Sequence, residues 1–482
     1  MKKFKLLFLI LLSIIPCAIF LSGCSFFDQK VYVTNIKATE VVGTTTTYTV
    51  YYSNGTHSMF TVENGTNGNN GQDLTLESIK KYCEDNNIDF ESFLKEYLTI
   101  VDKTESVQQA TASAIQSAVS VWCEFPVSNV YMKDTSISCG AGVIYKMNDT
   151  HSYIITNYHV VYYSKCDTEN NIASKIHLFQ YGTTEHIYET GEYDSNGYPE
   201  IGYGYGAVEA EFIGGSLNYD IAILKVATAD LLEFNEHATA ATIAEDYSLA
   251  ETAIAIGNPE TEGISVTSGI ISVESERITM LAADDKTQCT YRVMRIDTAV
   301  NGGNSGGGLF NINGELIGIV NAKVVDSQID NIAYAIPVEN ATQVADNLIY
   351  YYEKTGEISK VKTLKLDIVT VIDNSRSLYN PTTKKTTIKE DVIIYSVSLT
   401  SNSSHGVGVG YMMKLHTGDK LKSISINGEN HTINRDFELG DWLLSIRPGD
   451  KVLIKVIRDG SEQTLGFAEN AGVLEDYFTV IK

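Results

Sequence analysis

The sequence predicts a mainly β protein whose central part is an antiparallel barrel or sandwich. A series of short apolar runs occupies that part, among them CGAGVIY, SYIITNYHVV, DIAILKV, AIAIGNP and GGLFN. Gly, Asn and Asp separate the runs, as they do in the turns of all-β folds. The runs do not alternate regularly with helical segments, which argues against a doubly wound parallel sheet.

Length and charge limit the classes of protein to consider. A chain of 482 residues is expected to form about three domains at roughly 150 residues each. The 36 basic and 60 acidic residues give a net charge of −24, so the surface repels phosphate backbones and no nucleic-acid partner is expected. The 43% hydrophobic and 20% charged content is ordinary for a globular protein.

The first 24 residues have the pattern of an export signal. Three lysines, Lys2, Lys3 and Lys5, precede an apolar run over residues 6–21 that is short for a membrane-spanning helix. We therefore expect a signal peptide over residues 1–23, with an uncleaved anchor helix as the alternative. The following LSGC resembles the lipobox of bacterial lipoproteins, which implies lipidation of Cys24 and attachment to the extracytoplasmic face of the cell membrane.

Three further segments precede the central part. Residues 24–72 contain TTTTYTVYY, which predicts a small β element, and then NGTNGNNGQ, which predicts a spacer. Residues 73–104 are expected to form a helical stalk, because Phe90, Phe93, Leu94, Tyr97 and Leu98 recur at helical spacing.

The remaining chain divides into a central domain over 105–345, a linker helix over 346–361 and a C-terminal unit over 362–482. The last unit contains TGDKLKSISING and RPGDKVLIKVIRDG, each a strand-and-turn pattern. Residues 181–206, rich in Tyr, Gly and Asp, are expected to form an exposed insertion loop without an assigned task.

The cysteines and the short motifs predict neither a metal site nor a cofactor. Besides Cys17 and Cys24 there are five further cysteines, an odd number that argues against a complete disulfide framework. A single bridge between Cys123 and Cys139 stays open. No CxxC, HExxH or GxxxxGK[ST] motif occurs.

Three residues in distinctive contexts predict acyl-transfer chemistry. Ser305 lies in NGGNSGGGLF, where glycines let a substrate approach the main-chain N–H groups. His159 follows the β-branched run YIITNY, and Asp220 interrupts the apolar YDIAILKV. Alone, the histidine could be structural and the aspartate a strand cap. GNSGG also fits the G-x-S-x-G elbow of α/β-hydrolases, but the order His, Asp, Ser in a β-rich chain argues against that fold.

These contexts resemble the HtrA (DegP-like) trypsin-fold serine proteases. The resemblance rests on TNYHV, YDIAILKV and GNSGG, extends through AIGNP, VTSGIIS and NIAYAIPVENA, and covers residues 106–345. It implies a double antiparallel β-barrel and a triad of Ser305 as nucleophile, His159 as base and Asp220 as orienting acid. It also implies an oxyanion hole from Gly303 and Ser305.

The same resemblance implies what the enzyme binds. Ala299, Val320 and Asn321 are expected at the substrate pocket, and the uncharged Ala299 implies a preference for small or medium apolar side chains. The implied substrates are unfolded or damaged polypeptides, and the implied assembly is a homotrimer. The alternative is a catalytically silent binding or chaperone lipoprotein.

The C-terminal unit resembles the PDZ domain of HtrA proteases, although it lacks the usual glycine loop near residues 362–370, so a packing or regulatory role is an equal alternative to peptide capture. The nucleophile motif departs from the PGNSGGPL of the family by having Gly302 and Gly308 in place of proline. We therefore hypothesise that the resting enzyme is weak until substrate or an effector orders residues 302–305.

Overall fold

The computed structural model describes residues 33–42, 45–52, 55–63, 103–321, 332–383, 385–401, 406–467 and 472–481. The chain forms two compact units, Met1–Val101 and Asp102–Lys482, which are described separately. The predicted signal peptide (1–23), Cys24, the spacer (64–72) and nearly all of the predicted helical stalk (73–104) lie outside the described residues. Within those residues, no helix combines the length and apolar character needed to cross a membrane.

The first unit contains a three-stranded antiparallel sheet, β1 (Val33–Val42), β2 (Thr45–Tyr52) and β3 (His57–Glu63). Thr, Val and Tyr dominate the central strand, which is typical of the β-branched and aromatic residues that favour pleated backbone. The Thr39 and Thr49 hydroxyls form a 2.8 Å cross-strand hydrogen bond. These strands lie within the predicted small β element.

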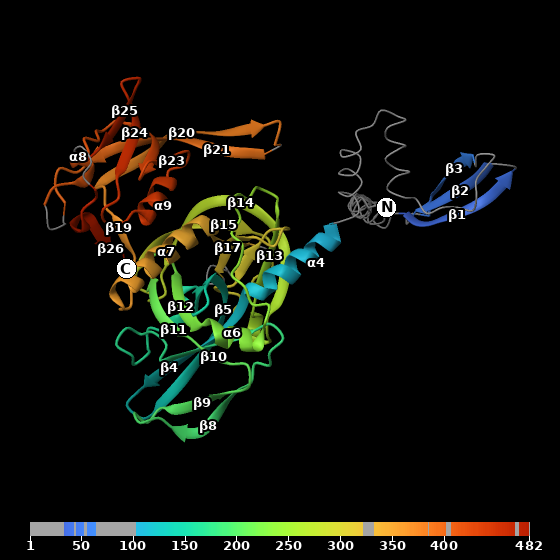
Figure 1. Ribbon diagram of the computed structural model, residues 1–482, viewed down its shortest axis with the longest axis horizontal. Helices are drawn as coiled ribbons and strands as arrows, with labels where there is room; N and C mark the ends of the chain where they lie inside the picture. Colours follow the sequence, from blue (N-terminus) through green and yellow to red (C-terminus); the bar gives the residue numbers. More distant parts are fainter. Residues whose placement is uncertain are drawn as a thin grey trace, which may run out of the picture. The chain divides into compact units, whose positions relative to one another are not determined.

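The second unit begins with helix α4 (Lys103–Ala114) and continues into a seven-stranded antiparallel sheet (Figure 1). The strand order is β10-β7-β4-β5-β6-β12-β11. Their bounds are β4 (Ala118–Ser128), β5 (Lys133–Met147), β6 (His151–Thr156), β7 (Lys175–Gln180), β10 (Val208–Glu209), β11 (Glu211–Ser216) and β12 (Ile221–Ala227). The apolar runs of the sequence are these strands.

Six further strands form a closed barrel, in the order β13-β14-β15-β18-β17-β16. Their bounds are β13 (Thr252–Gly257), β14 (Ser265–Leu281), β15 (Gln288–Ile296), β16 (Gly308–Phe310), β17 (Leu316–Asn321) and β18 (Ala333–Pro337). The prediction of a mainly β, trypsin-like fold is confirmed by these two antiparallel sheets and the additional C-terminal β domain.

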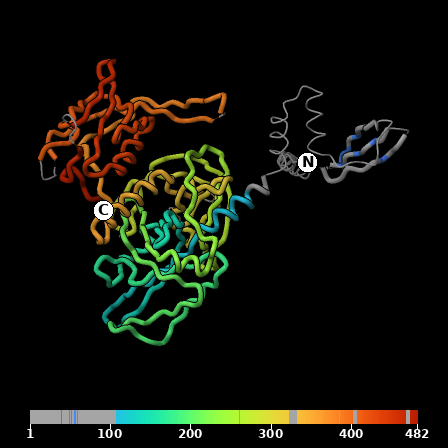
Figure 2. Tube along the Cα trace, in the orientation of Figure 1, coloured from blue at the N-terminus to red at the C-terminus, as the bar shows by residue number. Residues whose placement is uncertain are grey.

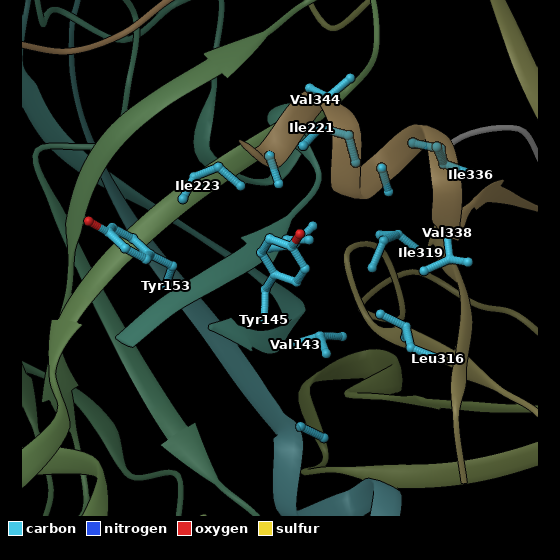
Figure 3. Close-up of a cluster of buried hydrophobic side chains, with 14 of the residues drawn as sticks. Val143, Tyr145, Tyr153, Ile221, Ile223, Leu316, Ile319, Ile336, Val338 and Val344 are labelled. Atoms are coloured by element: carbon cyan, nitrogen blue, oxygen red, sulfur yellow. The ribbon is translucent and has the colours of Figure 1, made fainter. Parts of the chain in front are cut away.

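Helix α7 (Val338–Thr355) joins both sheets and corrects the predicted linker helix over 346–361. Its side chains Val338 and Val344 share one buried cluster with Ile221 of the first sheet and Ile336 of the second (Figure 3). Burial of this apolar face stabilises the packing of the two sheets. The helix is therefore part of the central domain's core and begins before the predicted boundary. It ends at Gly356, whose φ of +70° is the left-handed conformation that glycine adopts at helix ends.

The C-terminal domain starts with β19 (Lys362–Leu364), which pairs with β26 (Phe478–Val480). Its main sheet contains β20 (Ile368–Asn380), β21 (Lys385–Val397), β22 (Lys420–Ile426), β23 (Glu429–Thr432), β24 (Val452–Arg458) and β25 (Ser461–Gly466). Two helices, α8 (Val409–Met412) and α9 (Glu438–Ser445), accompany it. Figure 2 shows β20 and β21 as a long projecting hairpin.

The structure corrects the predicted insertion loop and answers the open question of a Cys123–Cys139 disulfide. Residues 181–206 contain a short antiparallel hairpin, β8 (Ile187–Tyr193) and β9 (Pro199–Tyr203), and are therefore not simply a loop. Cys123 and Cys139 are free thiols. Trp122 lies opposite Cys139 in the β4–β5 register, so Cys123, one residue further along, faces the other side of the sheet and cannot reach it.

Candidate active site

Ser305 lies just after a tight turn between β15 and β16. The N–H of Asn304 donates to the carbonyl oxygen of Asn301 at 3.1 Å, and Gly303 has a φ of +94°. These two features define a type II turn, whose third position requires positive φ and therefore glycine. The turn presents the Ser305 side chain next to the junction of the two sheets. Ala141 of β5 fixes its position by donating its N–H to the Ser305 carbonyl oxygen at 2.8 Å.

Glycines next to the nucleophile let the two sheets approach each other closely. A Cβ at Gly306 would overlap the Ala141 carbonyl oxygen and the Thr156 hydroxyl, and Gly306 has a φ of +85°. A Cβ at Gly140 would approach the side chain of Val160 to 2.7 Å. The GNSGG sequence therefore reflects a close backbone approach as well as a turn.

His159 and Asp220 come from the first sheet. His159 is in the single-turn helix α5 (Tyr158–Val161), which follows β6, and Asp220 lies in the tight turn between β11 and β12. The Ser305 Oγ is 2.8 Å from His159 Nε2, and Asp220 Oδ2 is 2.7 Å from His159 Nδ1. The structure thus brings together three residues that lie far apart in the sequence. Asp220 follows His159 by 61 positions, and Ser305 follows it by 146.

The Asp220 carboxylate is buried and accepts several hydrogen bonds. Its oxygens accept hydrogen bonds from the His159 N–H at 2.9 Å, from the His159 ring and from Asn321 Nδ2 at 2.9 Å. Because a carboxylate only accepts, Nδ1 of the imidazole must carry the proton, which leaves Nε2 as the acceptor toward Ser305. Asp220 has a φ of +53°, an uncommon conformation for a non-glycine residue, and only 3% of its surface is exposed.

Two unoccupied donors lie beside the nucleophile. Among the described residues, no oxygen accepts a hydrogen bond from the N–H of Gly303 or of Ser305. These are the two groups expected to form an oxyanion hole, where preorganised N–H donors stabilise the negative oxygen of a tetrahedral intermediate.

The three predicted pocket residues separate in the structure. Ala299 is exposed, and its carbonyl oxygen accepts a hydrogen bond from the Thr267 hydroxyl at 2.8 Å. The Val320 side chain is fully buried in an apolar cluster of the closed barrel, together with Val300 and Leu309. Asn321 directs its amide at Asp220, so its side chain orients the acid and does not line a pocket. Only Ala299 offers its side chain to a substrate.

Two features of the site escaped the sequence analysis. The role of Asn321 depends on the position of β17 beside the β11–β12 turn, and its only signal in the sequence is a polar residue ending the apolar run ELIGIVN. The Asn157 amide also contacts Asp220, donating from Nδ2 to its carbonyl oxygen at 2.9 Å. Both amides hold the acid in its strained backbone conformation.

Cys139 lies next to the site without competing as a nucleophile. It precedes Gly140, and the pKa of its thiol is raised well above the usual range by burial and by the charge of Glu185. A thiol that remains protonated is a poor nucleophile. Ser305 is therefore the nucleophile that the geometry favours.

Comparison with known proteins agrees with this geometry. Residues 140–319 match the model of the trypsin-like peptidase domain. These residues form a trypsin-like peptidase domain, and the chain is similar in sequence to HtrA-type serine proteases. It is 27% identical over 347 residues to the serine protease Do-like HtrA of Bacillus subtilis (strain 168), a match that covers 69% of this chain and 63% of that protein.

A second relative, the serine protease Do-like HtrA of Lactococcus lactis subsp. lactis (strain IL1403), is 24% identical over 336 residues, covering 67% of this chain and 69% of the relative. Among solved structures, the HtrA-type protease AlgW with decapeptide is 21% identical, with a TM-score of 0.42, over 74% of this chain and 96% of that chain. The chain thus spans somewhat less than two thirds of the length of the B. subtilis relative.

Proposed function

We propose that the protein is an endopeptidase that cleaves unfolded or damaged polypeptides through a Ser305 acyl-enzyme. The observation that carries this proposal is the continuous hydrogen-bonded chain from Ser305 through His159 to Asp220, with 2.8 and 2.7 Å steps. Such a chain activates a serine that would otherwise be a weak nucleophile.

Each residue has a defined part in the reaction. The Ser305 Oγ attacks the peptide carbonyl carbon while His159 Nε2 accepts its proton, and the N–H groups of Gly303 and Ser305 bind the developing oxyanion. His159 then donates the proton to the leaving amine. Water then attacks the acyl-enzyme while His159 accepts its proton, and His159 returns a proton to Ser305 Oγ as the ester bond breaks. Asp220 holds the imidazole and stabilises its charged form throughout.

Ala299, at the predicted base of the specificity pocket, carries no charge, so cleavage after small or medium apolar residues is expected over cleavage after Lys or Arg. Polypeptides expose such residues when they unfold, which matches the proposed substrate class.

The setting of the enzyme is part of the proposal. Lipidation of Cys24 would attach the protease to the extracytoplasmic face of the cell membrane, the C-terminal domain would act as a PDZ-like module, and three chains would associate. The intact mass of protein extracted from membranes tests the first of these. An unmodified N-terminus would contradict it.

The decisive experiment compares the mature protein with its Ser305→Ala variant on casein. We expect cleavage by the first and none by the second, because the alanine removes the nucleophile and leaves the fold unchanged. Equal results for the two proteins would favour the alternative of a binding or chaperone lipoprotein.

A further inference from the structure

A carboxylate from the 181–206 insertion reaches into the central domain near the oxyanion turn. Glu185 lies between β7 and β8, and its two oxygens accept hydrogen bonds from two β4 side chains: Ser120 Oγ at 2.5 Å and Trp122 Nε1 at 2.7 Å. A third bond comes from Asn258 Nδ2, at 2.8 Å. A half-buried carboxylate with three donors is held firmly, because hydrogen bonds to a charged group are the strong ones.

Asn258 connects this carboxylate to the turn. It follows β13, is fully buried, and its side-chain oxygen accepts the N–H of Gly263 at 2.8 Å. Its amide nitrogen also approaches the Ser120 hydroxyl at 3.0 Å and the Cys139 sulfur at 3.2 Å. Its backbone N–H donates to the carbonyl oxygen of Gly303 at 3.3 Å.

The bond to Gly303 determines one of the peptide planes of the oxyanion turn. The Gly303 carbonyl belongs to the peptide whose N–H, on Asn304, closes the turn onto the Asn301 carbonyl oxygen. Asn258 thereby anchors the peptide that directly follows the one carrying the free Gly303 N–H. Without Glu185, the buried Asn258 amide would lose its charged acceptor. It would keep only the neutral acceptors Ser120 Oγ and Cys139 Sγ, and loss of a hydrogen bond to a charged group favours rearrangement of its surroundings.

We propose that Glu185 is a positioning residue for the oxyanion hole, acting through Asn258 on the Gly303 carbonyl. This inference rests on the proposed peptidase function. It gives the 181–206 insertion a role, because the insertion carries the Glu185 carboxylate that helps to fix the turn of residues 301–304.

The kinetic test uses Glu185→Gln, which keeps the shape of the side chain but removes its negative charge and leaves one accepting oxygen for the three donors. We expect kcat on a peptide substrate to fall by about 10- to 100-fold, with KM changing less than about threefold, since misplacement of the turn affects the transition state most. Trp122→Phe, which removes one donor to the same carboxylate, should show a smaller effect in the same direction.

The matched control is Glu192→Gln, in the same insertion but with an exposed side chain. Thermal unfolding midpoints of all variants would report any general loss of folding. If Glu185 only filled space, glutamine would replace it without loss. Equal kcat for the Glu185→Gln and Glu192→Gln variants would therefore overturn the proposal.

A second measurement does not depend on turnover. In the Ser305→Ala background, hydrogen exchange of the Asn258 and Asn304 amides should be faster with Glu185→Gln than with Glu192→Gln, because the first amide holds the Gly303 carbonyl and the second closes the turn. Equal exchange would refute the link from Glu185 to the turn. Lack of Ser305-dependent cleavage by the wild type would instead refute the proposed function and leave the exchange result decisive.

Discussion

Replacement of Gly302 by proline tests whether freedom of the oxyanion turn limits the enzyme. Gly302 is the second residue of the type II turn, where proline is favoured because its ring fixes φ near the required value. A Cβ built at Gly302 has no heavy atom within 4 Å, so the first side-chain carbon of a proline has room. Among the described residues, its N–H has no acceptor that proline would remove.

The expected magnitude follows from the entropy of the open turn. A proline at a compatible position stabilises the ordered form by about 0.4–1 kcal/mol. This corresponds to about a two- to fivefold rise in the ratio of ordered to disordered turn, since 1.4 kcal/mol is a factor of ten. If the resting turn is mainly disordered, basal kcat on a small peptide rises by up to that factor, and stimulation by unfolded protein shrinks accordingly.

Gly308 provides the matched contrast. A Cβ there would overlap the ring of Phe310, whose side chain is fully buried and has nowhere to move. Gly308→Ala should therefore destabilise the domain by about 1–3 kcal/mol, measured by urea unfolding, through overpacking.

The assay is the initial rate of peptide cleavage by each variant, with and without added casein as an unfolded effector. An unchanged basal kcat and an unchanged casein stimulation in Gly302→Pro, with the fold intact, would show that the turn is already ordered at rest. The hypothesis of a weak resting enzyme would then fail.

Two further predictions concern the contact between the central and C-terminal domains. Arg292 of β15 is buried between Glu339 of α7 and Asp441 of α9 and stacks on a phenylalanine ring at 3.8 Å. Arg292→Met should weaken the contact by about 3–5 kcal/mol because the buried Asp441 carboxylate loses its charged partner, whereas Glu339 is partly exposed; a normal urea midpoint for C-terminal domain unfolding would contradict this. Burial raises the pKa of Asp441 to about 6, although the positive charge of Arg292 acts to lower it. The folded-state pKa of Asp441 thus exceeds the unfolded value of about 3.9. The contribution of this carboxyl group to the free energy of unfolding is therefore fully present below pH 4 and is lost as the pH rises through 6. Urea titrations of the wild type and of Asp441→Asn at pH 4 and pH 7.5, followed by tryptophan fluorescence, measure this. A stability difference between the two proteins that is the same at both pH values would refute it.

The three residues that the structure brings within hydrogen-bond distance could be picked out from the sequence because each has a local signature. Ser305 lies among glycines, His159 follows an apolar strand and Asp220 precedes one. These signatures arise from backbone demands close to each residue, such as positive φ or a strand edge, and are therefore visible in a few neighbouring letters.

The supporting residues depend on strand registers that no local pattern contains. Asn321 meets Asp220 across 101 positions, and Glu185 meets Asn258 across 73. The excluded disulfide has the same origin, since only the β4–β5 register places Cys123 and Cys139 on opposite faces. The apolar face of α7 can be predicted from the spacing of its apolar residues, but the strands that pack against this face cannot.

The two departures from the proline-containing motif have different consequences for control of the site. Gly308 is part of strand β16, where the neighbouring phenylalanine ring takes the space of a side chain, so it adds no freedom to the loop. Gly302 is exposed and open. On the other side of the turn, Asn258 holds the Gly303 carbonyl and is itself held by Glu185. Freedom at the oxyanion turn is thereby confined to the peptide around Gly302, and an effector that orders the turn needs to act on that peptide or on the insertion that carries Glu185.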